Sequence, residues 1–184
     1  GGGRIIRLAA RSRGGIAAAQ LALAEAKDGH DRRPGTAPVS GGEVLVRRDG
    51  AAGRLSLNRP QALHALTRAM CREMSAALAA WRDDPAVQVV VIDHAGGRGF
   101  CAGGDINLLR HSALTDGGVA GRAFFFDEYR LNHQLFTYPK PVVALMDGIT
   151  MGGGVGISQP ARFRVATQNT RFAMPESGIG LFPD

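Results

Sequence analysis

Short runs of alternating apolar and polar residues begin the patterned part of the chain. Residues 44–46 and 54–57 alternate in this way, and the run between them, 49–53, contains two glycines. This pattern is typical of a β-hairpin. Pro60 ends the second strand, because proline has no N–H to donate to a β-ladder.

A helical period follows the hairpin. Apolar residues recur at spacings of four, four and three between residues 70 and 81, and Thr67 stands where it can cap the first turn. After this helix, the β-branched run 87–92 predicts a strand of the kind that is buried in a parallel sheet. The remaining predicted elements are a helix around 122–136, strands at 141–146 and 162–167, and a loop at 174–184. Strands that alternate with helices predict an α/β fold.

The chain divides at about residue 43. Residues 1–42 contain glycine pairs and a Pro-Gly-Thr-Ala-Pro run, with alanine in place of large apolar residues. Such a segment buries little surface, so we expect a low-complexity N-terminal extension or linker, with a short helix at 16–27. Its first 24 residues hold four arginines and no acidic residue, which is also typical of an organelle transit peptide. Residues 43–184 form the predicted domain.

Composition and charge exclude several classes of function. The chain of 184 residues is 45% apolar, yet no apolar run approaches 18 residues, so we expect no membrane span. Seven Lys/Arg against three Asp/Glu in residues 1–42 account for +4 of the net charge of +6. The rest of the chain has no basic stripe with interleaved aromatics, so nucleic-acid binding is not expected. Cys71 and Cys101 lie on different segments, and we expect two reduced thiols in a cytoplasmic protein, with the mitochondrial matrix as the alternative.

A glycine cluster at 147–156 follows the apolar run 141–146 and is the centre of the predicted chemistry. Three successive glycines let backbone N–H groups approach a ligand, and a helix that begins after Met151 would add its unpaired N–H groups. Such an arrangement stabilises an anion or a developing oxyanion. A second glycine loop at 96–105 follows another predicted strand, which suggests two backbone donors for one atom. Close helix packing without chemistry is the alternative explanation.

Other glycine and nucleophile motifs do not fit this cluster. No Lys-Ser/Thr pair follows it, which excludes a P-loop, and the spacing of Gly152, Gly154 and Gly156 differs from the dinucleotide-binding fingerprint. Ser158 lacks the last glycine of a nucleophile elbow. Nucleotide hydrolysis, hydride transfer and a serine nucleophile therefore lose support.

Four motifs in one order resemble the enoyl-CoA hydratase/isomerase (crotonase) superfamily. They are Asn-Arg-Pro-Gln-Ala-Leu at 58–63, Phe-Cys-Ala-Gly-Gly-Asp-Ile at 100–106, Gly-Ile-Thr-Met-Gly-Gly-Gly-Val-Gly at 148–156, and Phe-Ala-Met-Pro-Glu-Ser-Gly-Ile-Gly-Leu-Phe-Pro-Asp at 172–184. The resemblance covers about 43–184 and implies a crotonase-like spiral of ββα units whose C-terminal helical part is missing. It also implies an acyl-CoA substrate and no separate cofactor, because coenzyme A is part of that substrate.

The resemblance also assigns a site. It places an oxyanion hole at the backbone N–H groups of Gly104 and Gly153, which would both bind the substrate thioester carbonyl. Glu176 would be the general base that activates water or the nucleophile that forms a mixed anhydride. Asp184 would assist proton delivery, and Glu128 would contact the substrate near its hydroxyl. The residues beside Glu128 by themselves indicate a solvated, charged helix face.

The acidic residues decide between the reactions of the superfamily. Its hydratases resemble one another in having two glutamates, and the first of these positions is Gly156 here. The hydrolase branch is similar to this chain in having glycine at that point and an aspartate eight residues after its glutamate. The resemblance therefore implies hydrolysis of a short branched 3-hydroxyacyl-CoA thioester of valine breakdown. An enoyl-CoA hydratase or isomerase, or a non-catalytic acyl-CoA-binding fragment, is the alternative.

Three further features complete the expectation. His64 stands where relatives usually have asparagine, which questions the contacts of the nearby turn and not the chemistry. The five histidines form no ligand cluster, and no His-Glu-x-x-His spacing occurs, so we expect no metal. The superfamily implies contacts between subunits, so a homo-oligomer is expected.

Overall fold

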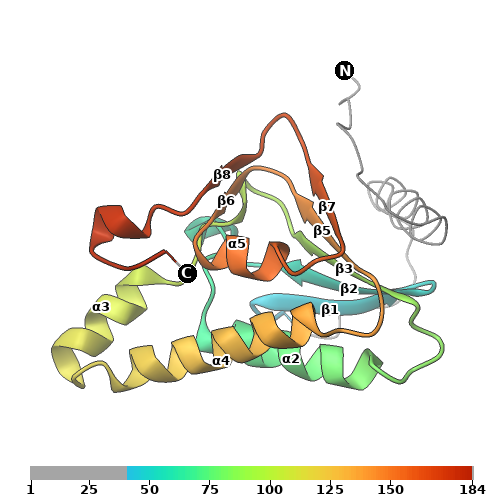
Figure 1. The fold of residues 1–184 in the computed structure, drawn as a ribbon, viewed down its shortest axis with the longest axis horizontal. Helices are drawn as coiled ribbons and strands as arrows, with labels where there is room; N and C mark the ends of the chain where they lie inside the picture. Colours follow the sequence, from blue (N-terminus) through green and yellow to red (C-terminus); the bar gives the residue numbers. More distant parts are fainter. Residues whose placement is uncertain (1–40, 184) are drawn as a thin grey trace.

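The computed structural model describes residues 41–183. Its strands are β1 (Val44–Asp49), β2 (Ala52–Leu57), β3 (Val89–His94), β4 (Gly99–Cys101), β5 (Val142–Met146), β6 (Ile149–Met151), β7 (Phe163–Ala166) and β8 (Arg171–Ala173). Its helices are α2 (Arg68–Trp81), α3 (Ile106–Thr115), α4 (Val119–Phe136) and α5 (Gly153–Ser158), with 3₁₀ turns η1 (Pro60–Ala62) and η2 (Glu176–Ile179). This order is that of an α/β protein (Figure 1).

The strands form two sheets, and from β3 onward the chain contributes strands to them alternately. The larger sheet has the order β1-β2-β3-β5-β7, in which β1 and β2 are antiparallel and every other pair is parallel. The smaller sheet has the order β4-β6-β8 and is parallel. Each of β3, β5 and β7 is followed by one strand of the smaller sheet, so every turn of the chain adds one strand to each sheet (Figure 1). The predicted α/β spiral is confirmed.

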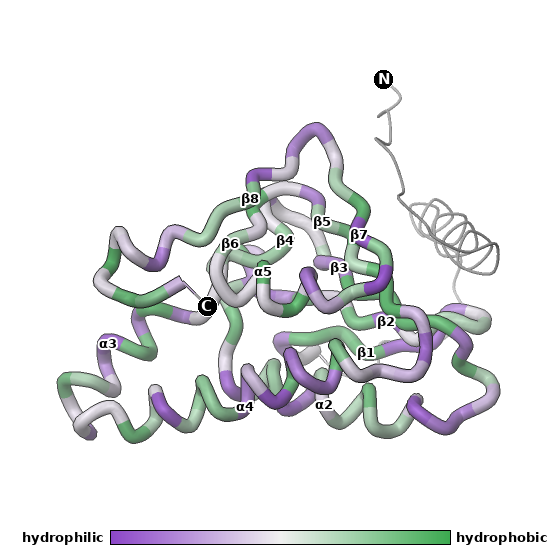
Figure 2. The backbone as a smooth tube through the Cα atoms, in the orientation of Figure 1, coloured by the Kyte–Doolittle hydropathy of each residue, from purple (hydrophilic) through white to green (hydrophobic). Residues whose placement is uncertain are grey.

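The main core lies between the larger sheet and the helices α2 and α4. Leu55, Leu57 and Ile92 of the sheet are fully buried in one cluster with residues of both helices. Hydrophobic and hydrophilic residues alternate along α4 in Figure 2, as expected for a helix with one face against a core. The predicted cap of α2 is confirmed, because the Thr67 side chain accepts a hydrogen bond from the Met70 amide at 3.2 Å.

Strand pairing moved or created several elements. The register with β2 places β3 at Val89–His94, two residues later than the predicted run 87–92. The strands β4 and β6 lie inside the two predicted glycine loops, and each has only three residues, so they form through their pairing with each other. The helix α3 has no counterpart among the predicted elements, and η2 occupies part of the predicted loop at 174–184. The predicted helix at 16–27 lies outside the described residues.

The turn between β2 and α2 connects two of the sequence motifs. The Arg59 guanidinium lies 2.9 Å from the Asp105 carboxylate and 3.0 Å from that of Glu43. Asp105 also caps α3, since its side chain accepts from the Leu108 amide at 3.4 Å. The Asn-Arg-Pro motif therefore ties the start of the domain to the first glycine loop.

His64 occupies a strained position in this turn, with φ of +56°. The Arg59 amide donates to its Nδ1 at 2.9 Å, so Nε2 carries the proton and donates to the Gly96 carbonyl at 2.7 Å. The ring is therefore neutral and bridges the turn to the first glycine loop, which answers the question that the departure from asparagine raised. Burial lowers the pKa of His64, and the nearby positive charges of His94 and Arg59 lower it as well. The hydrogen bond to Gly96 opposes this change.

Protonation of His64 should weaken the fold. Because the folded-state pKa lies below that of an unfolded histidine, the unfolded chain takes up the proton first as the pH falls below about 6.5. Stability contributed by neutral His64 is therefore complete above that pH and is lost as the pH falls through it. We expect His64→Asn, which tolerates positive φ, to flatten this loss in urea unfolding between pH 7.5 and 5. Exposed His111→Asn serves as the control, and equal slopes for His64→Asn and wild type would contradict the assignment.

Candidate active site

The two glycine loops touch through their backbones. Gly103 has φ of +109°, and a Cβ placed on it would lie 3.2 Å from the Met151 oxygen and 3.4 Å from the Gly153 nitrogen. A Cβ on Gly154 would overlap the carbonyl oxygen of Cys101. Main chain meets main chain at both points, so the contact depends on residues without side chains.

The segment before α2 holds the first of these loops. Leu66 donates its amide to the Gly103 oxygen at 2.7 Å, and Asp105 donates to the Leu66 oxygen at 3.0 Å. These bonds form a parallel bridge between Leu66 and Gly104, in which the Gly104 N–H takes no part. Within residues 41–183, this amide is left available to an acceptor in the adjoining cavity.

The second backbone donor stands at the start of α5, as the glycine cluster predicted. Gly153 is the first residue of this helix and follows Gly152, which has φ of +51°. The first N–H groups of a helix have no acceptor within it. Since the Gly153 nitrogen adjoins Gly103, the Gly104 and Gly153 amides belong to neighbouring backbone segments.

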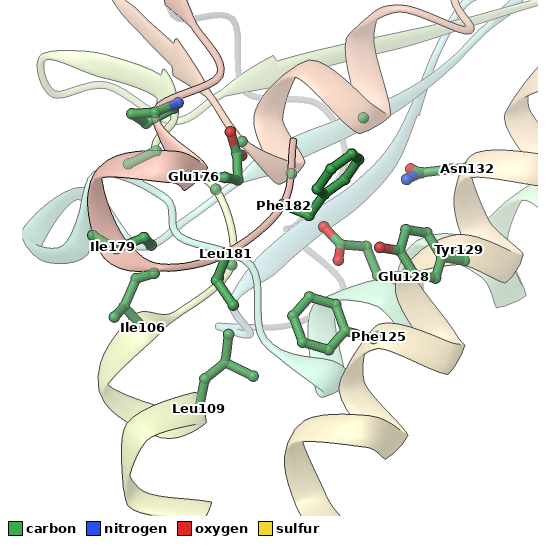
Figure 3. A pocket seen from close by; sticks show the side chains of 17 residues that line it. Ile106, Leu109, Phe125, Glu128, Tyr129, Asn132, Glu176, Ile179, Leu181 and Phe182 are labelled. Carbon is green, nitrogen blue, oxygen red and sulfur yellow. The ribbon is translucent and has the colours of Figure 1, made fainter. Parts of the chain in front are cut away.

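Both glycines border one cavity of about 600 Å³. Its walls come from the two glycine loops, from α3 and α4, and from the segment after β8 (Figure 3). The apolar part of the wall is formed by Ile106, Leu109, Phe125, Ile179, Leu181 and Phe182. Glu128 projects into it from α4 and Glu176 from η2 (Figure 3). The fold thus brings together four of the five predicted site residues.

Glu176 has a carboxylate oxygen that the fold does not use. Its Oε2 is buried and, within the described chain, has no hydrogen-bond partner. Its Oε1 would lie 2.9 Å from a Cβ placed on Gly152, so the carboxylate rests against the residue that precedes Gly153. Buried polar atoms without a partner are uncommon, and in a cavity they indicate a place for water or a ligand.

Glu128 is buried rather than solvated, with 4% of its surface exposed. The local interpretation of a charged surface face is therefore wrong, because the fold turns this side of α4 toward the glycine loops. A Cβ on Gly153 would overlap Glu128 Oε1, so glycine is the residue type that fits at position 153 beside this carboxylate.

Asn132 and Tyr129 also line the cavity, although the residue pattern did not single them out as functional. Asn132 follows Glu128 by four residues, which places both on the same side of α4. Its Nδ2 would lie 2.7 Å from a Cβ on Gly156, so its amide stands over the position where hydratases of the superfamily have a glutamate. The sequence did contain a signal for Asn132, because it is a polar residue at helical spacing from the apolar Phe125 and Phe136.

The two cysteines are free and buried. Burial raises the pKa of Cys101 to about 12, and burial together with the charge of Glu128 raises that of Cys71 further. Both thiols are therefore protonated at neutral pH, which makes them poor nucleophiles.

The remaining predictions concern residues or groups at the margins of the site. Asp184 lies outside the described residues, so its role stays a prediction. Within residues 41–183, no three His, Cys, Asp or Glu side chains gather closely enough to hold a metal ion. In the same range, no helix combines the length and apolar character needed to cross a bilayer.

Comparison with curated proteins identifies close relatives. The chain is 53% identical over 150 residues to the mitochondrial 3-hydroxyisobutyryl-CoA hydrolase of Xenopus tropicalis, covering 79% of this chain and 38% of the relative. It is 48% identical over 142 residues to the human mitochondrial 3-hydroxyisobutyryl-CoA hydrolase, covering 77% of this chain and 36% of that protein. The chain thus spans under two fifths of the length of these relatives.

Solved structures share the fold. A carnitinyl-CoA dehydratase from Mycobacterium thermoresistibile superposes with a TM-score of 0.75 at 51% identity, covering 77% of this chain and 42% of that one. An enoyl-CoA hydratase from Rhodobacter sphaeroides gives a TM-score of 0.75 at 48% identity. This match covers 78% of this chain and 42% of the hydratase. The sequence model of the family described as enoyl-CoA hydratase/isomerase matches residues 52–184. With this match over most of its length, the chain belongs to the enoyl-CoA hydratase/isomerase (crotonase) family.

Proposed function

We propose that this chain carries the catalytic residues of a thioesterase that hydrolyses 3-hydroxyisobutyryl-CoA to 3-hydroxyisobutyrate and coenzyme A. The observation that supports it most is one cavity lined by Gly104, Gly153 and Glu176, whose Oε2 has no partner within the described chain. About half of the matched residues are identical to those of 3-hydroxyisobutyryl-CoA hydrolases.

The chemistry follows from these groups. Glu176 takes a proton from water, the hydroxide attacks the thioester carbon, and the carbonyl oxygen becomes negative. The Gly104 and Gly153 amides stabilise that charge. The C–S bond then breaks, and the leaving thiolate of coenzyme A takes up the proton that Glu176 holds, with Asp184 assisting its delivery. Glu176 is thereby returned to its carboxylate form. Direct attack by the Glu176 carboxylate on the carbonyl, followed by hydrolysis of the anhydride, uses the same arrangement.

The residue at 156 favours hydrolysis over hydration. Addition of water to a double bond in this family uses two glutamates, and Gly156 has no side chain to serve as the first. The place is occupied by the amide of Asn132, which does not exchange a proton at neutral pH. One carboxylate beside an oxyanion hole is sufficient for hydrolysis of a thioester.

A hydratase or isomerase is the second candidate, and one observation favours it. Glu128 lines the same cavity as Glu176, so the chain does supply a second carboxylate from another element. The solved relatives described as a dehydratase and a hydratase are also about half identical. Measuring thiol release from 3-hydroxyisobutyryl-CoA and loss of the double bond of crotonyl-CoA by the full-length protein separates the two reactions.

The compartment is proposed from the same comparisons. The curated relatives are named as mitochondrial proteins, and the arginine-rich start of the chain fits the mitochondrial alternative better than the cytoplasmic one. A fluorescent fusion to residues 1–42 should locate in mitochondria, and diffuse cytoplasmic fluorescence would favour the first expectation.

Glu176→Gln should remove most of the hydrolysis while leaving substrate binding. A loss of roughly 10²- to 10⁴-fold in kcat is expected, because the amide cannot accept the proton. The assay is release of free thiol from 3-hydroxyisobutyryl-CoA. Glu73→Gln makes the same chemical change on α2, outside the cavity, and should keep wild-type turnover. A non-catalytic acyl-CoA binder predicts no turnover in either protein and equal binding by both.

Gly153→Ala should disturb both the oxyanion donor and its neighbour. The added methyl overlaps Glu128 Oε1, and displacement of a catalytic group by about 1 Å costs on the order of 10²-fold in kcat/KM. Gly41→Ala is the matched control, since a Cβ there meets nothing within 4 Å. Unchanged turnover in a folded Gly153→Ala protein would contradict the assignment of this amide.

A further inference from the structure

The Asn132 side chain has an oxygen that the described fold leaves without a hydrogen-bond partner. Within residues 41–183 it makes no hydrogen bond, and its Oδ1 is buried without a partner. A carboxamide that serves only the fold is normally bonded to backbone or to another side chain. This one instead borders the cavity (Figure 3).

Its position places a donor at a defined point in that cavity. Asn132 and Glu128 are neighbours on one face of α4, and Figure 3 shows both on the same wall. The Nδ2 atom reaches over Gly156, close enough that a methyl group there would lie 2.7 Å away. The absence of a side chain at 156 is therefore what gives the amide its room.

We propose that Asn132 determines specificity by recognising the 3-hydroxyl group of the acyl chain. This inference rests on the proposed function for the substrate class. A hydroxyl group offers one donor and two acceptor lone pairs. It can donate to Asn132 Oδ1, which has no partner within the described chain, or accept from Nδ2, and the Glu128 carboxylate on the same wall is a further acceptor.

The same pair would reject esters that lack the hydroxyl. An unsubstituted acyl chain leaves the Asn132 carboxamide without the bonds that a hydroxyl group would supply. Sites built to bond a hydroxyl discriminate strongly for this reason. The apolar side chains on the other walls, including Leu109 and Phe125, do not distinguish the two esters in this way.

Binding measurements test the inference separately from catalysis. In full-length protein carrying Glu176→Gln, affinities for 3-hydroxyisobutyryl-CoA and isobutyryl-CoA are measured by titration calorimetry. Without a substitution at 132, the hydroxylated ester should bind about 10- to 100-fold more tightly. Adding Asn132→Leu, which keeps the shape, should reduce the ratio to near one while changing the affinity for isobutyryl-CoA by less than about threefold.

Two further variants control for folding and for side-chain chemistry. Asn107→Leu makes the same change on the exposed side of α3, outside the cavity, and should keep the preference for the hydroxylated ester. Gly156→Ala adds a methyl that moves the Asn132 amide and should lose the preference in the same way as Asn132→Leu, even if the latter does not fold.

The outcomes are distinguishable. A lack of preference in the protein with Asn132 intact, or an equal loss of affinity for both esters in Asn132→Leu, would overturn the inference. A retained preference combined with no thiol release from either ester by the protein with Glu176 intact would refute the proposed hydrolysis and support recognition of the hydroxyl. If Asn132→Leu loses the preference for the hydroxylated ester, and the protein with Glu176 intact releases thiol from it, the results support both the inference and the proposed hydrolysis.

Discussion

The site depends on one close contact, in which the backbones of two glycine loops meet without side chains between them. A Cβ on Gly103 would lie only 3.2 Å from the Met151 oxygen, and a Cβ on Gly154 would overlap the carbonyl oxygen of Cys101. A Cβ at either point would separate the loops and move the amides of Gly104 and Gly153 apart. Preorganised donors cost nothing to orient during a reaction, but only if their separation is held constant.

The turn before α2 supplies the rigidity that this contact needs. The Leu66 backbone bonds fix the first loop from one side, and the Arg59 ion pair with Asp105 fixes its end. His64 adds a neutral bridge to Gly96, at the start of the same loop. These contacts explain why the Asn-Arg-Pro motif accompanies the glycine motifs, although none of its residues borders the cavity.

The cavity has an unusual charge balance. Within the described chain its lining includes two carboxylates, Glu128 and Glu176, and no lysine or arginine. Backbone N–H groups are therefore its main source of positive potential, and they are concentrated where the glycine loops meet. A substrate that develops negative charge is favoured at that point alone, because elsewhere on the wall it would meet carboxylates or apolar side chains.

The three residues proposed to favour hydrolysis and to recognise the acyl chain come from different elements. Gly156 belongs to α5, Asn132 to α4 and Glu176 to η2. A side chain at 156 and the amide at 132 compete for one space. A glutamate at 156 would therefore alter two features together, namely the number of carboxylates available for proton transfer and the position of the Asn132 amide.

Local pattern predicted much of this protein. The hairpin, the Thr67 cap and the predicted helix on α4 follow from periods and capping preferences that act within a few residues. The backbone role of the glycines was also available, because a run without Cβ atoms has few other uses. Family motifs then pointed to Glu176, and the structure places it in the same cavity as Gly104 and Gly153.

Tertiary structure decided what lies on each side of those elements. The charged neighbours of Glu128 indicate a solvated face, yet packing of α4 against the glycine loops buries it. The strands β4 and β6 exist because they pair with each other across a separation of some fifty residues, which no local propensity encodes. The role inferred for Asn132 likewise depends on a missing side chain on another helix. The sequence by itself determined the hairpin, the two long helices and the glycine runs, whereas the pairing of β4 with β6 and the distances between segments, and so the chemistry, arise only from long-range packing.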